Sequence, residues 1–300
     1  GVSCTTGHRC TFVGYYSGAN NTTGTDNTAV GRASFGNNTT GAGNTAIGAN
    51  ALNACTTGSN NTAGGGDALV ALTTGGHNTA FGKGAADAVT TADNNTAFGS
   101  HSLASNTEGG NNVVMGREAM FTPTNIGNTT AIGYRALYSL SNTGYNCTAV
   151  GYESLANNTT GAQNNAFGRE ALEDNTTGSN NCAFGYLSLQ KNTTGDNNTA
   201  LGHNCLSLST TASYNTAVGF DCLESNTSGT NNTGVGTDAL TANTTANNNT
   251  AVGYRALYAN TTGGSNTAVG EDCLYSNTTA GGNTGVGQGA LKDNTEGHSN

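Results

Sequence analysis

Cysteine is the side chain of this sequence best suited to covalent chemistry, and the chain contains eight. An even number of cysteines in an extracellular chain is consistent with disulfide bonds. We predict one bond between Cys4 and Cys10, because each replaces a turn asparagine within a single repeat. Cys205 and Cys222 lie one repeat apart, close enough for a second bond. However, like Cys273, they occupy a position usually filled by alanine or serine, where cysteine acts as a small buried apolar side chain. No spacing resembles a zinc site.

Asn-X-Thr/Ser sequences are the second set of residues with a candidate covalent role. In a secreted eukaryotic protein they are acceptors for N-linked sugars. Asparagine, threonine and glycine also form good turns, so the sequence can be a by-product of turn chemistry. We expect this turn position to be exposed under both interpretations. The asparagines that share it are Asn21, Asn38, Asn158, Asn175, Asn192, Asn226, Asn243, Asn260 and Asn277.

Acidic residues recur two positions after a repeated glycine and form a broken stripe. The stripe comprises Asp67, Glu118, Glu153, Glu170, Asp221, Asp238 and Asp272. A calcium site needs several oxygen ligands that converge on one point, so we interpret the stripe as a solvated face that keeps the protein soluble. The five histidines are scattered over different repeat positions, and no nucleophile, base and orienting group can be nominated together. We predict no enzymatic activity, no metal and no cofactor.

The composition limits the class of protein further. With a net charge of -9, the chain lacks the basic stripe of a nucleic-acid-binding protein, and we expect no nucleic-acid partner. No run approaches the roughly 20 apolar residues of a membrane helix, so we expect no membrane insertion. Charged residues make up only 9% of a chain with 46 glycines. Its apolar residues recur at fixed positions, which favours an ordered repeat protein over a disordered chain.

These residues are positioned by a repeat whose glycine recurs every 17 residues, for example at Gly236, Gly253 and Gly270. The interval is 18 residues between Gly133 and Gly151, which indicates a one-residue insertion between residues 137 and 147. A period of this size is typical of a solenoid. We predict a single continuous repeat array over residues 1–300, with about 17 coils. Because the repeats start in mid-coil and show no polar caps, we expect a window of a longer chain or filament.

Two short apolar segments per repeat, separated by Gly- and Asn-rich turns, predict an all-β fold, a parallel β-solenoid. In the repeat at residues 249–263 we expect Val252 and Leu257 to form core ladders with their equivalents, at about 4.8 Å per coil. Gly253 marks a turn, and the small Ala256 permits close approach of another layer. Neighbouring strand residues face opposite sides. The alanine beside Val252 must therefore be covered by another leg of the coil or by another chain, as in a homotrimer.

An asparagine ladder is the other constant feature of the repeat. Asn249 has an equivalent asparagine in most repeats. Amide side chains stacked in this way can hydrogen-bond along a parallel stack. Such a ladder fixes the register of strands that are otherwise weakly patterned. We therefore predict a structural role for Asn249.

The repeat Asn-Thr-Ala-Val-Gly-Tyr-Arg-Ala-Leu-Tyr at residues 249–258, with Asn-Thr-Thr-Gly at residues 260–263, resembles repeats of bacterial and phage tail-fibre-domain proteins. Its Ala-Val-Gly core is also similar, more distantly, to the head repeats of trimeric autotransporter adhesins. Those head repeats form left-handed parallel β-rolls, so the resemblance implies left-handed coils and trimerisation. The resemblance covers essentially the whole chain and is specific for architecture.

We expect a structural extracellular fibre or filament shaft that serves as a rigid spacer or attachment element. Its partner would be itself, through head-to-tail continuation or a homotrimer. The alternative is a phage tail fibre or surface adhesin that binds cell-surface glycans, which an exposed aromatic row would favour. The candidate row is Tyr15, Tyr134, Tyr152, Tyr186, Phe220 and Tyr254. The Thr-rich turns make an ice-binding solenoid a minor alternative. Consecutive threonines argue against it, because they would point to opposite sides and form no alternating Thr-X-Thr row.

Overall fold

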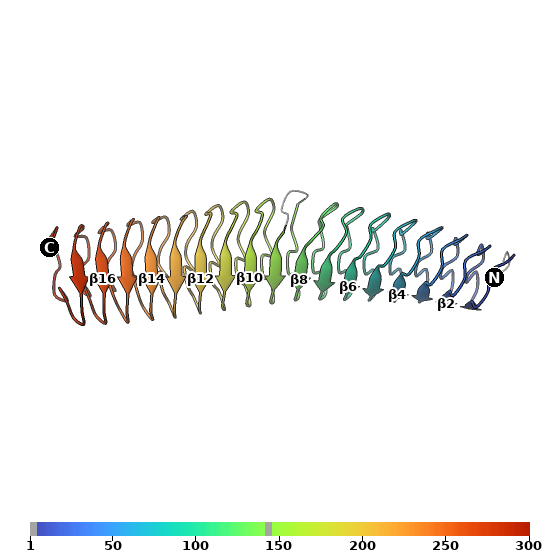
Figure 1. Ribbon diagram of the computed structural model, residues 1–300, viewed down its shortest axis with the longest axis horizontal. Coiled ribbons are helices and arrows are strands. Elements are labelled where there is room, and N and C mark those ends of the chain that lie inside the picture. The colour runs from blue at the N-terminus through green and yellow to red at the C-terminus, as the bar shows by residue number, and fades with distance from the viewer. Residues whose placement is uncertain (1–4, 142–145) are drawn as a thin grey trace. The chain divides into compact units, whose positions relative to one another are not determined.

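The computed structural model describes residues 5–141 and 146–300, and the chain divides into two compact units, residues 1–147 and 148–300. Within the described part of the chain the regular secondary structure is β-strand (Figure 1), and no helix there is long and apolar enough to span a membrane. The first unit contains β1 (Thr11–Val13), β2 (Thr28–Val30), β3 (Thr45–Ile47), β4 (Thr62–Gly64), β5 (Thr79–Phe81), β6 (Thr96–Phe98), β7 (Val113–Met115) and β8 (Thr130–Ile132). The second contains β9 (Thr148–Val150), β10 (Asn165–Phe167), β11 (Cys182–Phe184), β12 (Thr199–Leu201), β13 (Thr216–Val218), β14 (Thr233–Val235), β15 (Thr250–Val252), β16 (Thr267–Val269) and β17 (Thr284–Val286).

The boundary between the units lies within the interval, Gly133 to Gly151, in which the repeat lengthens by one residue. The predicted insertion falls partly on residues 142–145, which lie outside the described residues. The prediction of a single array that continues through both units therefore stays a prediction.

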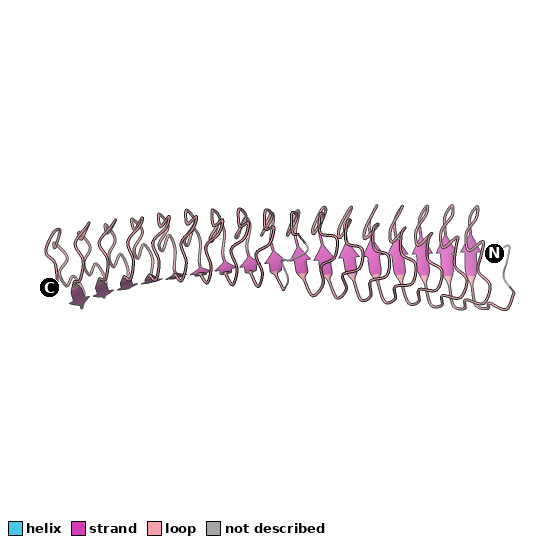
Figure 2. Ribbon diagram, turned by 90° about the horizontal axis from the view of Figure 1, so that it is seen from above, coloured by secondary structure: helices cyan, strands magenta, loops and turns pink. Residues whose placement is uncertain are grey.

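Within each unit, every strand pairs in parallel with the strand of the neighbouring coil. In the first unit Thr28 faces Thr45, and in the second unit Thr250 faces Thr267, so identical repeat positions lie beside one another. Coil-to-coil hydrogen bonds continue outside the strands, as from Leu257 N to Cys273 O at 3.0 Å. Figure 2 shows the strands of each unit as one row, with loops completing each coil. The predicted parallel β-solenoid is confirmed for each unit, while left-handedness stays a prediction.

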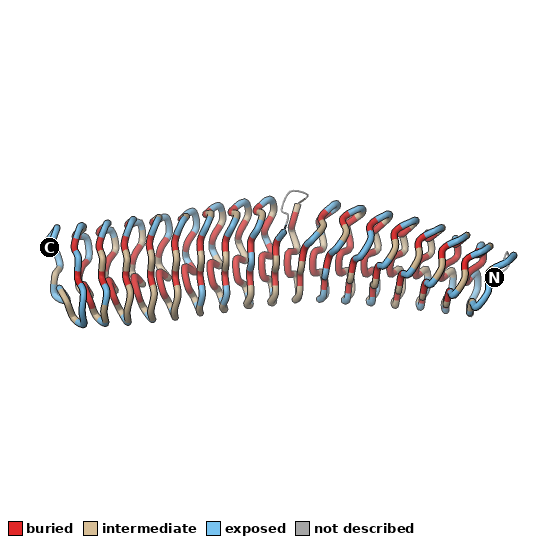
Figure 3. Tube along the Cα trace, in the orientation of Figure 1, coloured by how far each residue is buried: buried red, intermediate tan, exposed pale blue. Residues whose placement is uncertain are grey.

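One of the two predicted core ladders is wrong. Ala251, in the middle of β15, is fully buried, whereas Val252 beside it is only half-buried. The equivalents of Val252 include Val269, which is 37% exposed, and Ile47, which is 50% exposed. Successive side chains of a strand alternate between its two faces. The alanine therefore fills the interior shown in red in Figure 3, and the valine ladder covers the outside of the coil.

Alanine occupies the interior because the opposite leg of the coil lies close to it. Gly234 replaces the alanine in β14, and a Cβ atom there would lie 2.5 Å from Cys222 Sγ and 3.5 Å from Leu223 Cδ1. Ala256 and Leu257 occupy the same two repeat positions as these residues and are also fully buried. The alanine side is thus covered by another leg of the same chain. The reason for expecting a covering second chain no longer applies.

A glycine ladder forms the corner at which the chain leaves each strand. Gly253 has a φ of 135°, a conformation that residues with a side chain rarely adopt. A Cβ atom at this position would also lie 2.6 Å from the carbonyl carbon and oxygen of Gly270 in the next coil. Conformation and close approach therefore both require glycine.

Three further positions in the same coil hold residues other than glycine in the left-handed region. Arg255, Leu257 and Ser265 have φ values of 53°, 52° and 60°. This conformation costs a residue about 1–2 kcal/mol. Each backbone N–H donates to a neighbouring coil, Arg255 to Thr237 O and Ser265 to Asn247 O, both at 3.0 Å. Bonding between coils, together with burial of Leu257, offsets the conformational cost.

Gly65 and Gly66 provide a matched test of the glycine corner. Gly65 has a φ of 133°, and a Cβ atom would lie 2.5 Å from Gly82 O, whereas the nearest atom to a Cβ at Gly66 is Ala49 O at 3.9 Å. We expect Gly65→Ala to lower the free energy of unfolding by about 2–4 kcal/mol. We expect Gly66→Ala to change it by less than about 0.5 kcal/mol. Denaturant unfolding followed by circular dichroism measures both, and equal effects would contradict the requirement for glycine.

Candidate functional site

The ladder that contains Asn249 connects three successive coils. The Asn249 N–H donates to Asn232 Oδ1 at 3.0 Å, and Asn249 Oδ1 accepts from the Asn266 N–H at 2.9 Å. Asn249 Nδ2 donates to Gly263 O at 2.9 Å, in the turn that leads into Asn266. The side chain is fully buried, and buried polar groups are stable only where they are hydrogen-bonded. The amide thus joins its coil to the next one through both its oxygen and its nitrogen.

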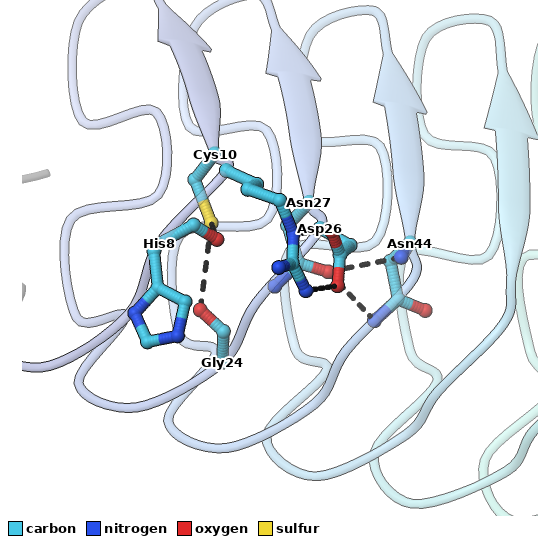
Figure 4. Close-up of polar contacts among 7 residues, drawn as sticks. His8, Cys10, Gly24, Asp26, Asn27 and Asn44 are labelled. Atoms are coloured by element: carbon cyan, nitrogen blue, oxygen red, sulfur yellow. Dashed lines mark hydrogen bonds and ion pairs between the residues drawn. The ribbon is translucent and has the colours of Figure 1, made fainter.

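The same ladder runs through the first unit, where Figure 4 shows Asn27 and Asn44. Asn27 Oδ1 accepts from the Asn44 N–H at 2.9 Å and from Asn44 Nδ2 at 3.3 Å. Asn44 Nδ2 also donates to Gly58 O at 2.9 Å. At the surface beside the ladder, the guanidinium of Arg9 pairs with the Asp26 carboxylate at 2.8 Å. The predicted structural asparagine ladder is confirmed in both units.

The asparagines of the Asn-Thr-Thr-Gly turn form a second buried ladder, so the expectation that this position is exposed is wrong. Asn260 Nδ2 donates to Asn243 Oδ1 at 3.1 Å and to Gly263 O at 3.0 Å. Asn277 Nδ2 donates in turn to Asn260 Oδ1 at 3.0 Å. The asparagines with 0% exposure are Asn21, Asn38, Asn158, Asn175, Asn192, Asn226, Asn243, Asn260 and Asn277. The amide points into the coil because it closes the turn by bonding to the glycine carbonyl.

Substitutions within the chain show that this turn position belongs to the core. Leu72 and Val89 replace the asparagine in two coils of the first unit, and both are fully buried. An apolar side chain of this kind fits an interior position and gains little at an exposed one. A sugar on the Asn260 amide would have to break the hydrogen bonds that close the turn. Burial therefore argues against N-glycosylation at the nine predicted asparagines.

Sequence reasoning missed a second set of Asn-X-Thr sequences whose asparagine is exposed. It lies one position before the Asn249 ladder, and a search for the bare motif would have found it. The set comprises Asn60, Asn94, Asn128, Asn146, Asn197, Asn231 and Asn248, all exposed and all with φ values between 58° and 60°. Asparagine tolerates the left-handed conformation better than most residues, so the backbone accounts for asparagine here.

The buried cysteines behave as small apolar side chains. Cys205 and Cys222 lie in neighbouring coils and form no disulfide, and the Cys205 thiol lies 2.7 Å from Gly219 O. Burial raises the pKa of the Cys205 thiol to about 11 and that of Cys222 to about 12. Thiols this weakly acidic remain protonated near neutral pH and are poor nucleophiles. The predicted Cys4–Cys10 bond involves Cys4, which lies outside the described residues, and stays a prediction.

The residues of the acidic stripe adopt the left-handed conformation at the corner, two positions after the repeated glycine. Glu118 and Asp238 have φ values of 56° and 57°. Arg135 Nε lies 2.8 Å from Glu118 Oε2, and Arg255 Nε lies 3.5 Å from Asp238 Oδ2. The hydrogen bond from Arg135 lowers the pKa of Glu118. Some carboxylates of the stripe therefore form ion pairs with an arginine of the next coil. In residues 5–141 and 146–300 no three His, Cys, Asp or Glu side chains gather closely enough to hold a metal ion.

An exposed column in the second unit is the best candidate for contact with a ligand. It consists of Tyr152, Arg169, Tyr186, His203 and Phe220, each directly after a repeated glycine. The Arg169 guanidinium lies 5.3 Å from the Tyr152 ring centre and 5.8 Å from that of Tyr186. The His203 ring lies 5.0 Å from Tyr186 and 5.1 Å from Phe220. These contacts join successive coils through cation–π and ring stacking.

The stacked column leaves its outer edge available to solvent. Tyr186 is 39% exposed and Phe220 is 49% exposed. The predicted row contained Tyr152, Tyr186 and Phe220 but omitted Arg169 and His203, which make this part of the row continuous. A search restricted to aromatic residues could not find an arginine that stacks between two rings.

Comparison with known protein families found none that matches this chain, and comparison with curated proteins found no matching relative. The similarities to tail-fibre and autotransporter repeats therefore rest on the repeat motif itself.

The two asparagine ladders differ in how much they tolerate substitution. Asn249→Leu would leave the buried Asn266 N–H without its acceptor, so we expect a loss of about 2–4 kcal/mol in the free energy of unfolding. Asn260→Leu leaves Gly263 O bonded to Asn249 Nδ2, and Leu72 occupies the equivalent position. We expect it to cost less than about 1 kcal/mol. Thermal and denaturant unfolding of the two variants test this order, and the reverse order would assign the principal ladder to Asn260.

Proposed function

We propose that this chain is a structural repeat protein, the shaft of an extracellular fibre or filament that acts as a rigid spacer or attachment element. The observation that supports the proposal most directly is the set of ladders that bond each described coil to its neighbours. They include the strands, the glycine corner and two rows of buried asparagine. The interior is thus filled by groups that hold coils together.

The ladders repeat the same hydrogen bonds between coils along each unit. In one coil, β15 pairs with β16, Asn249 Oδ1 accepts from the Asn266 N–H, and Thr261 Oγ1 donates to Thr278 O at 3.1 Å. Each coil contacts only its neighbours, so the array can lengthen without a change in its core. A spacer needs this property, because its length can be set by the number of coils.

The outer face of the strands supports self-association as part of the proposal. None of the strand residues is Asp, Glu, Lys or Arg, so copies with a net charge of -9 can approach there with little repulsion. The exposed ladders that contain Ile47 in the first unit and Val269 in the second are apolar. A second copy carries the same ladders at the same spacing and would match them coil by coil. We therefore propose further copies of this chain as its partners.

Electron cryo-microscopy of the native material tests the proposal. We expect fibres with an axial repeat of about 4.8 Å, in which neighbouring copies contact through the strand face or continue one another. The full chain isolated from its source, without denaturation, is the sample. Monodisperse single copies that bind a small ligand or turn over a substrate would contradict a structural role.

A second candidate function, recognition of cell-surface glycans, is favoured by the exposed column from Tyr152 to Phe220. Tyrosine hydroxyls, a guanidinium and an imidazole are hydrogen-bonding groups suited to a sugar. Nearby carboxylates such as Glu170 and Asp221 disfavour polyanionic ligands. We therefore propose neutral glycans as the ligand class for this alternative.

A glycan array tests this alternative with a matched pair of variants. We expect Tyr186→Ala to reduce binding at least tenfold, because it removes the centre of the column. Tyr258→Ala is the control, because Tyr258 stacks on Tyr275 at 5.1 Å in a different column of the same unit. Absence of binding by the unaltered chain, or an equal loss in both variants, would exclude the column as a glycan site.

A further inference from the structure

We propose that the second threonine of the Asn-Thr-Thr-Gly turn, represented by Thr262, is an acceptor for O-linked sugars. The turn offers three candidate groups, the Asn260 amide and the hydroxyls of Thr261 and Thr262. The structure separates them by burial and by hydrogen bonding. The inference does not depend on the fibre or glycan-binding proposals.

The first two groups are already engaged in holding the coils together. Asn260 is fully buried, and its amide nitrogen donates to Asn243 Oδ1 and Gly263 O. Thr261 Oγ1 donates to Thr278 O at 3.1 Å. The same bond recurs in other coils, for example from Thr176 Oγ1 to Thr193 O at 2.9 Å. A sugar on either group would remove a contact between coils.

The third group is exposed and its hydroxyl makes no hydrogen bond within the described residues. Thr262 lies at the outside of the turn, beside Gly263, which has no side chain to shield it. The equivalent residues are all exposed and form one row in each unit. They are Thr6, Thr23, Thr40, Thr57, Thr74 and Thr91 in the first unit, and Thr160, Thr177, Thr194, Thr211, Ser228, Thr245, Thr262 and Thr279 in the second.

The second threonine of the turn is kept in coils in which the asparagine two residues before it is replaced. Leu72 and Val89 replace the asparagine, yet Thr74 and Thr91 remain. The same holds for Cys55 and Ser209, which precede Thr57 and Thr211 at the same distance. An N-linked acceptor sequence is lost at the turn in these coils, while the exposed hydroxyl is kept.

Among residues 5–141 and 146–300, no hydrogen bond of the Thr262 side chain accounts for the recurrence of a hydroxyl at this position. Solubility alone is satisfied by other polar residues, as Glu108 and Glu296 show at equivalent positions. Repetition of threonine, with one serine, retains an exposed hydroxyl oxygen that, unlike the Oγ1 of the first threonine, is not used to bond the next coil. O-glycosyl transfer requires such an oxygen.

The transfer needs a sugar nucleoside diphosphate as donor and a glycosyltransferase as catalyst. The Thr262 Oγ1 attacks the anomeric carbon of the donor sugar, and its proton passes to a base of the transferase. The bond between the anomeric carbon and the diphosphate oxygen breaks, and the nucleoside diphosphate leaves with the electron pair. The product carries one new C–O bond per modified threonine, and no oxidation or reduction takes place.

Peptide mapping of the native protein tests the proposal. Chymotryptic peptides are analysed by mass spectrometry with electron-transfer fragmentation, which keeps sugars attached to their residues. We expect sugar mass increments on Thr262 and its equivalents, including Thr74 and Thr91, and none on Thr261. The same chain made in a host without enzymes that transfer sugars to protein hydroxyls should show only unmodified masses.

Two variants made in the native host sharpen the assignment. Thr262→Val should abolish the increment in its coil, whereas the matched Thr261→Val should leave it unchanged. Unmodified masses throughout the native protein would overturn the proposal, and so would sugars on Thr261, on Asn260 or on the exposed Asn248. The mapping of the unaltered protein is decisive by itself, so a variant that fails to fold leaves the test valid.

Discussion

Register between coils is the constraint on which the rest of the structure depends. A 17-residue spacing places each residue beside its own equivalent, as the pairing of Thr250 with Thr267 shows. Backbone groups in strands and corners alike then bond to neighbouring coils. A parallel stack of identical coils turns every repeat position into a ladder, so one substitution affects the coils on both sides. The longer interval between Gly133 and Gly151 accordingly contains the boundary between the two units.

The corners are the positions where this register costs conformational energy. Gly253 combines a φ of 135° with a close approach to Gly270, and Leu257 adopts a φ of 52° although it has a side chain. Left-handed residues are unfavourable in isolation. They recur here in successive coils because each corner directs an N–H or a carbonyl toward the next coil. Repetition thus makes a locally unfavourable backbone part of a cooperative array.

A narrow interior explains why asparagine matters as much as apolar residues. The space inside the strand admits Ala251, and the opposite leg supplies Ala256 and Leu257, so the apolar surface buried per coil is small. Asn249 and Asn260 add buried amides whose donors and acceptors are bonded within and between coils. Fully bonded polar networks can specify a single arrangement where a small apolar core does not. This division of roles suits a protein with only 34% hydrophobic residues.

The sequence by itself determined the period, the parallel solenoid and the Asn249 ladder, because a fixed spacing imposes translational register whatever the details of the coil. Only the tertiary structure decided which side chains face inward. Val252 is more apolar than Ala251, yet it faces out, because the space opposite the strand fits only a small side chain. Asn260 lies in a segment with the composition of a surface turn, yet its side chain faces inward, because its amide closes that turn. These choices depend on distances between legs of the coil, which a pattern along the chain does not contain.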